Sequence, residues 1–226
     1  MRRPLIVLRP EPGNARTAAA IEALGGEAIR LPLFTIEPRP WHAPDPAAFD
    51  VLLATSANAF RQGGAGLAGL RDLPVWAVGA TTAEAARAAG FTVARIGEGD
   101  GRTLALTAPA GLRMLHLAGK ERIAPAGIAA TVMTRSVYAA PPTDVSAAAI
   151  AGAAGGVALL YSTRAARRWA ELVDLHRLPR DTIRLATIGK AVATAAGDGW
   201  NRVAAAAVPT DAAVVTLALG LSIDAE

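Results

Sequence analysis

The chain has 226 residues, a formal net charge of +4 and no cysteine, and this length is enough for one large domain or two smaller ones with a sizeable core. The lack of cysteine excludes disulfides, thiolate nucleophiles and cysteine-ligated metal centres, and it fits a reducing cytoplasm. The basic residues are almost all scattered arginines without a basic run, so we expect no nucleic-acid partner, whereas a small polyanion would suit them well.

Short unbroken apolar runs alternate with alanine-rich stretches along the chain. In chain order the runs are LIVL (5–8), VLLA (51–54), VWAV (75–78), MLHLA (114–118), ALLY (158–161) and LATI (185–188). Such runs are typical of strands that are covered on both faces, as in parallel sheets. The stretches between them have the length of crossover helices. The pattern predicts an α/β fold with parallel sheets.

Neither of two apolar segments has the form of a targeting or membrane segment. The run at residues 5–8 is followed at once by Arg9 and Pro10, so it is too short for a signal peptide and is expected to form the first buried strand. The uncharged stretch 145–163 is built largely of alanine and glycine, which favours a helix, a turn and a strand over a span. We therefore expect no membrane association.

The sequence contains an internal duplication, because three kinds of unit recur in the same order. RPLIVLRP (3–10) is echoed by LRMLHLAGKER (112–122). FDVLLATSANAFRQ (49–62) is echoed by GVALLYSTRAARRWAEL (156–172), and VWAVGATTAEAARAAGF (75–91) by RLATIGKAVATAAGDGW (184–200). The duplication predicts two α/β halves of similar plan.

Each copy of the first unit ends in an extended segment flanked by prolines, at residues 32–40 and 136–142. Proline disfavours helix and biases the residue before it toward extended backbone. The two segments could pair as a two-stranded linker or remain separate surface loops.

The turns after the predicted strands carry small, polar or basic residues. The carboxyl ends of parallel strands share one edge of the sheet, where ligands usually bind. Each such residue could simply cap a helix, but a set of helix-start amides and hydroxyls is also well suited to carboxylates. The candidate binding residues are Arg9, Thr55, Ser56, Asn58, Gly79, Thr82, Gly119, Lys120, Ser162, Thr163, Gly189 and Lys190.

Other familiar site motifs are missing or stand in the wrong context. GAGLAG (64–69) matches a dinucleotide pattern in letters but precedes a strand instead of linking a strand to a helix, and no P-loop is present. There is no G-x-S-x-G, and the three histidines lack metal-ligand spacing. His116 is expected to be a core residue. Nucleotide, hydrolase and metal functions are therefore unsupported.

The two tyrosines lead to different expectations. Tyr138 stands in the second proline-flanked segment, where its phenol could donate a proton or a hydrogen bond to a ligand, or could serve as an aromatic plug. Tyr161 ends a buried apolar run and is expected to lie in the core.

The chain resembles the uroporphyrinogen-III synthase family over nearly its whole length. The resemblance rests on the order and spacing of VLRPEPGNA with LPLFTIEP, LLATSANAFR, VWAVGATTAEAARAAGF, SVYAAPP, LLYSTRAARRW, and IGKAVATAAGDGW with VPTDAAVVTLAL. It implies two flavodoxin-like domains in a crossed-over arrangement, with residues 1–36 and 139–226 in domain 1 and residues 37–138 in domain 2. A two-stranded ladder, 34–38 with 137–141, would join them beside a cleft that holds the active site.

The resemblance also implies an activity. The family cyclises hydroxymethylbilane with loss of water and inversion of the terminal pyrrole ring, which gives uroporphyrinogen III for tetrapyrrole and heme biosynthesis. This is a lyase (hydro-lyase) reaction, and it requires no metal or organic cofactor. The implied protein is a cytoplasmic monomer, and its substrate could be channelled from the upstream bilane-forming deaminase.

The resemblance assigns roles to individual residues. Tyr138 matches the family's cleft tyrosine, which assists departure of the hydroxyl group. The matching hydroxyl and amide residues of the turns are Thr55, Ser56, Asn58, Thr82, Ser162 and Thr163. Lys190 departs from the pattern, because many members carry hydroxyl residues in that turn, and here a charge would replace those contacts.

Two other readings of the same residues remain. The first is a non-catalytic, two-domain protein that binds or senses a polycarboxylate. The second is a nucleotide-dependent α/β transferase, which would need a glycine fingerprint between a strand and a helix, and that fingerprint is missing.

Overall fold

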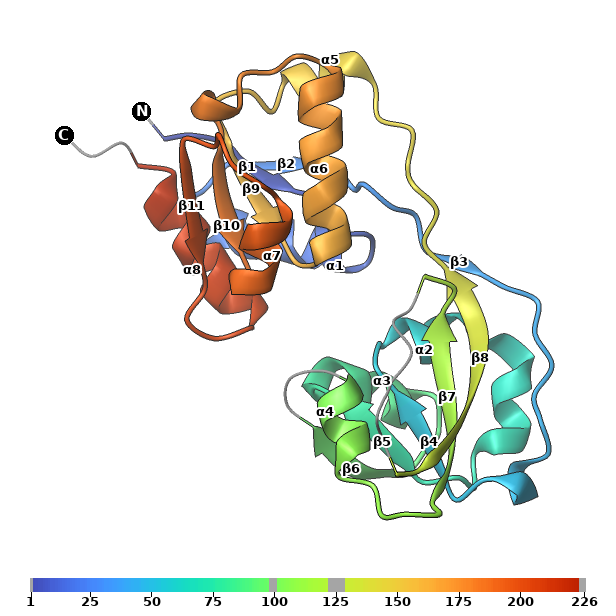
Figure 1. Cartoon of the computed structure of the whole chain (residues 1–226). Coiled ribbons are helices and arrows are strands. Elements are labelled where there is room, and N and C mark those ends of the chain that lie inside the picture. Colours follow the sequence, from blue (N-terminus) through green and yellow to red (C-terminus); the bar gives the residue numbers. More distant parts are fainter. Residues whose placement is uncertain (1, 98–100, 122–128, 224–226) are drawn as a thin grey trace. The chain divides into compact units, whose positions relative to one another are not determined.

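The computed structural model describes residues 2–97, 101–121 and 129–223. The chain forms two compact units, which are described separately. Unit 1 comprises Met1–Thr35 and Pro142–Glu226, and unit 2 comprises Ile36–Pro141. Both units are α/β structures built on sheets of mainly parallel strands, so the predicted fold class is confirmed (Figure 1).

Unit 1 contains a five-stranded sheet in the order β11-β10-β9-β1-β2, in which every neighbouring pair is parallel. Its strands are β1 (Leu5–Val7), β2 (Ala28–Arg30), β9 (Val157–Leu160), β10 (Arg184–Thr187) and β11 (Arg202–Ala205). All residues of β1 and β9 are buried, as their unbroken apolar runs predict.

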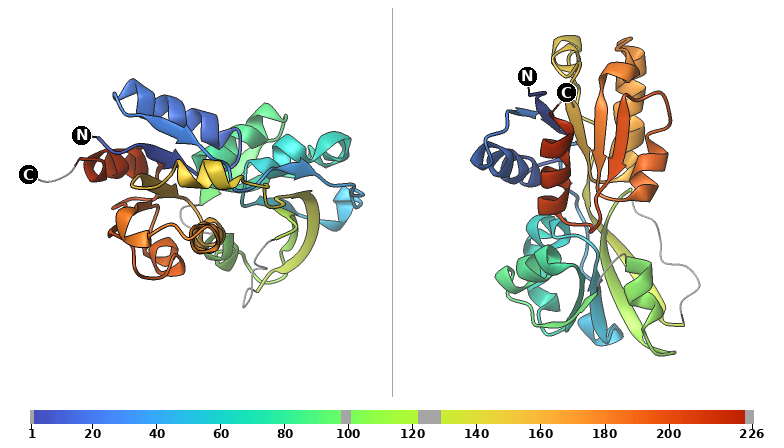
Figure 2. Two further views of the ribbon diagram at one scale, coloured as in Figure 1. Left: turned by 90° about the horizontal axis from the view of Figure 1, so that it is seen from above. Right: turned by 90° about the vertical axis from the view of Figure 1, so that its left-hand side faces the viewer.

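The helices of unit 1 cover both faces of this sheet. They are α1 (Gly13–Ala23), α5 (Ala147–Ala151), α6 (Thr163–Leu175), α7 (Lys190–Ala195) and α8 (Asp211–Leu221), with a 3-10 turn at Arg180–Thr182. Figure 2 shows α1 and α8 on one side of the strands and α6 and α7 on the other. Ile21 of α1 and Val214 of α8 pack in one core cluster with Leu5 and Leu159.

Unit 2 contains a six-stranded sheet in the order β3-β8-β7-β4-β5-β6. The strands are β3 (Glu37–Pro38), β4 (Val51–Ala54), β5 (Val75–Val78), β6 (Val93–Gly97), β7 (Arg113–Gly119) and β8 (Thr131–Ala139), and only β3 runs antiparallel to its neighbour. The helices are α2 (Asn58–Gln62), α3 (Ala80–Ala88) and α4 (Gly101–Leu106), with 3-10 segments at Pro46–Ala48 and Gly64–Leu70. The GAGLAG letters therefore form a 3-10 segment before β5, not a dinucleotide turn.

The central strand pair is equivalent in the two sheets. In unit 1, β1 pairs with β9 in the register Leu5↔Val157. In unit 2, β7 pairs with β4 in the register Met114↔Val51. Each pair combines a strand of the first repeated sequence unit with a strand of the second, taken from the other copy. The internal duplication thus has a direct counterpart in the strand pairing.

The two proline-flanked segments pair with each other. β3 runs antiparallel to β8 with Pro38 opposite Tyr138, and an isolated bridge joins Phe34 and Pro142. The backbone N–H of Arg39 donates to the Val137 carbonyl at 3.0 Å. The alternative of two separate surface loops is therefore wrong.

Candidate functional site at the strand edges

A switch point of strand order marks the place in each sheet where ligands usually bind. In unit 1 the connection from β1 leads to α1 on one face, and the connection from β9 leads to α6 on the other (Figure 2). The crevice beyond the carboxyl ends of such a strand pair is the usual ligand position in open α/β sheets. In unit 2 the equivalent pair is β4 and β7.

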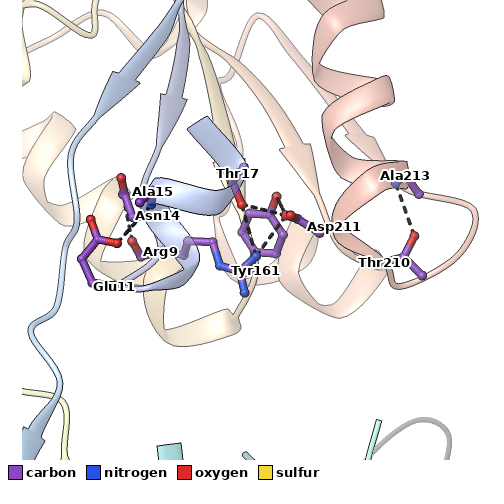
Figure 3. A network of polar contacts seen from close by, with 9 residues as sticks. All are labelled: Arg9, Glu11, Asn14, Ala15, Thr17, Tyr161, Thr210, Asp211 and Ala213. Atoms are coloured by element: carbon purple, nitrogen blue, oxygen red, sulfur yellow. Dashed lines mark hydrogen bonds and ion pairs between the residues drawn. The ribbon is translucent and has the colours of Figure 1, made fainter. Parts of the chain in front are cut away.

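A polar network lies at this position in unit 1 (Figure 3). One carboxylate oxygen, Oδ1 of Asp211, accepts hydrogen bonds from three side chains that come from three separate segments of the chain. The donors are Arg9 Nη1 at 3.0 Å, Thr17 Oγ1 at 2.8 Å and the Tyr161 hydroxyl at 2.6 Å. The Arg9 guanidinium carbon also lies 4.3 Å from the centre of the Tyr161 ring.

Local structure explains why Asp211 stands there. Thr210 caps α8, since its hydroxyl accepts a hydrogen bond from the Ala213 N–H at 3.3 Å (Figure 3). Asp211 follows in the first turn, where the positive end of the helix dipole stabilises a carboxylate. The carboxylate thus interacts favourably with both the helix dipole and the Arg9 guanidinium.

The turn that carries Arg9 is held by hydrogen bonds from the buried Asn14 side chain. The Asn14 amide donates to the carbonyls of Val7, at 2.6 Å, and of Arg9, at 2.9 Å. Beside it, the Glu11 carboxylate accepts from the Ala15 N–H and pairs with Arg30. Desolvation opposes the charged form of Glu11, but these contacts together hold its pKa below the usual value.

Tyr161 differs from its expected role as a plain core residue. Its ring packs against the core of unit 1, but the side chain is only partly buried and its hydroxyl donates to Asp211. Burial raises the pKa of Tyr161 above the ordinary value, and the Asp211 carboxylate raises it further. The phenol therefore stays protonated and remains a donor at neutral pH.

The other predicted turns of unit 1 contain a residue that caps a helix and side chains that are exposed. Ser162 caps α6, since its hydroxyl accepts from the Ala165 N–H at 3.1 Å, and it is also exposed. Thr163 is the first residue of that helix. Gly189 precedes α7 with extended backbone, and Lys190, the first residue of α7, is exposed. The side chains of Ser162 and Lys190 are therefore accessible to a ligand.

In unit 2, two of the predicted side chains in the turn after β4 already form polar contacts within the protein. Thr55 Oγ1 lies 3.4 Å from Nε2 of His116, which is buried as predicted. The Ser56 hydroxyl accepts from the Asn58 N–H at 3.2 Å. Asn58 begins α2 and is half-buried. The three predicted residues lie in one turn, at the switch point of this sheet.

The turn after β5 shows which threonine is accessible. Gly79 has φ of +77°, a conformation that favours glycine, and its N–H donates to the Gly97 carbonyl at 2.9 Å. Thr82 is only 5% exposed, whereas the neighbouring Thr81 is exposed at the start of α3. The resemblance matched Thr82 to the family pattern, but helical periodicity places its neighbour Thr81 on the open side.

Gly119, the last residue of β7, lies beside Tyr138 of β8. A Cβ atom at Gly119 would lie 2.9 Å from both Cε2 and Cζ of the Tyr138 ring, so only glycine leaves room for the ring in this position. The Lys120 N–H donates to the Tyr138 carbonyl at 2.8 Å, and the Lys120 side chain is exposed. Arg122, which ends the repeated segment LRMLHLAGKER, lies outside the described residues.

Comparison with known proteins decides the family. The family model described as uroporphyrinogen-III synthase HemD matches residues 15–216. The chain belongs to the uroporphyrinogen-III synthase family. No curated protein sequence matches it significantly.

Solved structures of uroporphyrinogen-III synthases have the same fold. The enzyme from Helicobacter pylori 26695 is 19% identical, with a TM-score of 0.65, and the alignment covers 98% of this chain and 100% of that one. A mutant enzyme from the extremely thermophilic bacterium Thermus thermophilus is 18% identical, with a TM-score of 0.56 and coverage of 98% and 97%. At these identities the likeness concerns the fold.

Within the described ranges, no helix is long and apolar enough to cross a membrane. The same residues contain no group of three or more His, Asp or Glu side chains that could hold a metal ion.

The environment of Tyr161 can be tested by titration. In a Tyr138→Phe variant Tyr161 is the one remaining tyrosine, and its ultraviolet phenolate signal should titrate above the ordinary pKa of about 10. Burial and the Asp211 carboxylate both disfavour the phenolate, so adding Asp211→Asn should lower this pKa. The urea-unfolded variant provides the ordinary reference. Titration of the folded variant at or below that reference would contradict the network.

Proposed function

We propose that this protein is a uroporphyrinogen-III synthase. It cyclises hydroxymethylbilane with loss of water and inversion of the terminal pyrrole ring, and so serves tetrapyrrole and heme biosynthesis. The observation that carries the proposal is the match of the family model to residues 15–216, nearly the whole chain. The strand-edge turns add chemical support, because they offer donors and cations suited to a substrate rich in acetate and propionate groups.

The reaction is a lyase reaction in which the substrate supplies most of the chemistry. Loss of the terminal hydroxyl as water leaves an electrophilic azafulvene. The substituted carbon of the last pyrrole attacks it, and the resulting spiro intermediate fragments and recloses with that ring inverted. Without the enzyme the bilane closes to the symmetric type I isomer. The protein must therefore orient the substrate, and orientation can contribute about 7–11 kcal/mol.

The two compact units are proposed to be two flavodoxin-like domains in a crossed-over arrangement. The strand order of unit 1, counted from β2, follows the 2-1-3-4-5 order of flavodoxin-like sheets. In unit 2 the parallel strands lie in the order β8-β7-β4-β5-β6. This is the same 2-1-3-4-5 order when β7 is counted as strand 1 and β8 as strand 2. The first repeated unit of each copy would thus contribute its strands to the sheet that is otherwise built from the other copy.

Substrate carboxylates are proposed to bind at the carboxyl edges of both sheets. The accessible groups that support this are Ser162 and Lys190 in unit 1 and Lys120 in unit 2. The remaining predicted binding residues are Arg9, Thr55, Ser56, Asn58, Gly79, Thr82, Gly119, Thr163 and Gly189. Of these, Thr82 is buried, so we expect its neighbour Thr81 to provide the hydroxyl.

Tyr138 is proposed to assist departure of the substrate hydroxyl. Its backbone pairs in the sheet of unit 2, and its ring packs beside Gly119, where a Cβ atom would lie 3.1 Å from the phenol oxygen. A phenol at such a position can donate a hydrogen bond or a proton to a leaving oxygen.

We also propose that the enzyme is a cytoplasmic monomer. The large exposed apolar side chains of the described structure, for example Leu24, Ile96 and Leu175, are distributed over several segments of the chain, which favours a monomer. Because the bilane closes spontaneously, direct transfer from the upstream deaminase would protect it. The comparisons give no support to the alternative of a non-catalytic polycarboxylate sensor.

The proposed activity is tested by supplying freshly made hydroxymethylbilane and separating the uroporphyrinogen isomers. We expect type III product in excess of the type I product that forms without protein. Type I product alone, from fresh and folded protein, would refute the proposal.

The role of Tyr138 is tested with Tyr138→Phe, which keeps the ring against Gly119 but removes the hydroxyl. We expect kcat to fall about 10²-fold, as for loss of a positioned proton donor. Circular dichroism and urea unfolding should match the wild type. An unchanged kcat would return Tyr138 to the role of an aromatic plug.

A further inference from the structure

Three side chains donate to Asp211 at the strand edge of unit 1, and this residue was not among the predicted binding residues. It is 202 positions from Arg9 and 50 from Tyr161 in the chain. Its Oδ1 nevertheless joins the turn after β1, helix α1 and the end of β9 to the start of α8 (Figure 3). The side chains of Arg9 and Asp211 are 23% and 28% exposed, so both are partly accessible to a ligand.

Asp211 occupies only one side of the Arg9 guanidinium. Nη1 donates to Asp211 and, at 3.3 Å, faces the Thr17 hydroxyl. Within the described part of the chain, Nε and Nη2 of Arg9 have no hydrogen-bond partner. A guanidinium carries five N–H donors in a fixed fork that fits a carboxylate. The arginine is therefore tied at one nitrogen and retains donors for a second anion.

Two further contacts fix the orientation of the guanidinium. One face lies over the Tyr161 ring, and the ring hydroxyl is itself held by Asp211. The guanidinium also lies close to Gly13, where a Cβ atom would be 2.5 Å from Nε and 3.0 Å from Nη2. The absence of a side chain at Gly13 is thus a condition for this position of Arg9.

We propose that Asp211 is a positioning residue that holds Arg9 with its free donors ready for a carboxylate of the substrate. The inference rests on the proposed function for the identity of the ligand. Asp211 does not touch the substrate and acts through Arg9, with Tyr161 and Thr17 as its supports. A long, flexible arginine gains from such support, because fewer rotamers are lost when the ligand binds.

The test compares KM and kcat for hydroxymethylbilane in four variants. Asp211→Asn keeps the shape but removes the charge that holds Arg9, and Gly13→Ala displaces the guanidinium while leaving Asp211 in place. We expect KM to rise about tenfold in both, as for loss of a charge-assisted hydrogen bond, with kcat within about twofold of the wild type. Asp211→Glu retains a carboxylate and should recover part of the affinity.

The matched control is Asp174→Asn. Asp174 also forms an ion pair with an arginine, since both of its carboxylate oxygens accept from Arg180, at 2.8 and 2.6 Å. It lies near the carboxyl end of α6, away from the strand edge that carries Arg9. Loss of this pair should leave KM unchanged, which separates the effect of position from the general effect of losing an ion pair.

Failure of the positioning role of Asp211 and failure of the proposed function give different results. An unchanged or lower KM in either folded test variant overturns the inference, and a lower KM in Asp211→Asn would mean that Asp211 competes with substrate carboxylates. If Asp211→Asn does not fold, Gly13→Ala decides, since alanine suits the first turn of a helix. Wild-type protein that forms no type III isomer would instead refute the proposed function.

Discussion

Parallel strands that are buried on both faces are the constraint on which the rest of this structure depends. Burial on both faces requires helices on each side, and each helix must begin near the carboxyl end of the strand before it. All strand-to-helix turns of one sheet therefore meet at one edge. The polar residues of these turns gather there, although they are far apart in the sequence.

The two sheets use this edge differently. Unit 1 places a charged network around Asp211, in which an arginine, a tyrosine and a threonine share one carboxylate oxygen. Unit 2 places a neutral Thr55 beside His116 and seats Tyr138 against Gly119. The repeat thus conserves the backbone plan while the side chains diverge, which suits a substrate whose ends must be treated differently.

Much of the fold could be predicted from the sequence, because fully buried strands such as β1 and β9 must be unbroken apolar runs. The edge strands β6 and β11 gave no such run, because most of their residues are exposed or only partly buried. At the candidate site, the positions of the turns could be predicted from the sequence. Which side chains form hydrogen bonds with one another there could not be predicted. The Arg9–Asp211 contact spans nearly the whole chain, and the Tyr161 hydroxyl is hidden in an apolar run. Local patterns carry no signal for either.

We propose that carboxylate recognition at the strand edges provides the orientation that the reaction requires. It is tested most directly by anaerobic calorimetric titration of the folded protein with uroporphyrinogen III and with its methyl ester. The free acid should bind, with an affinity that falls as salt screens the charges, and the ester should not bind measurably. Equal binding of acid and ester would contradict the account.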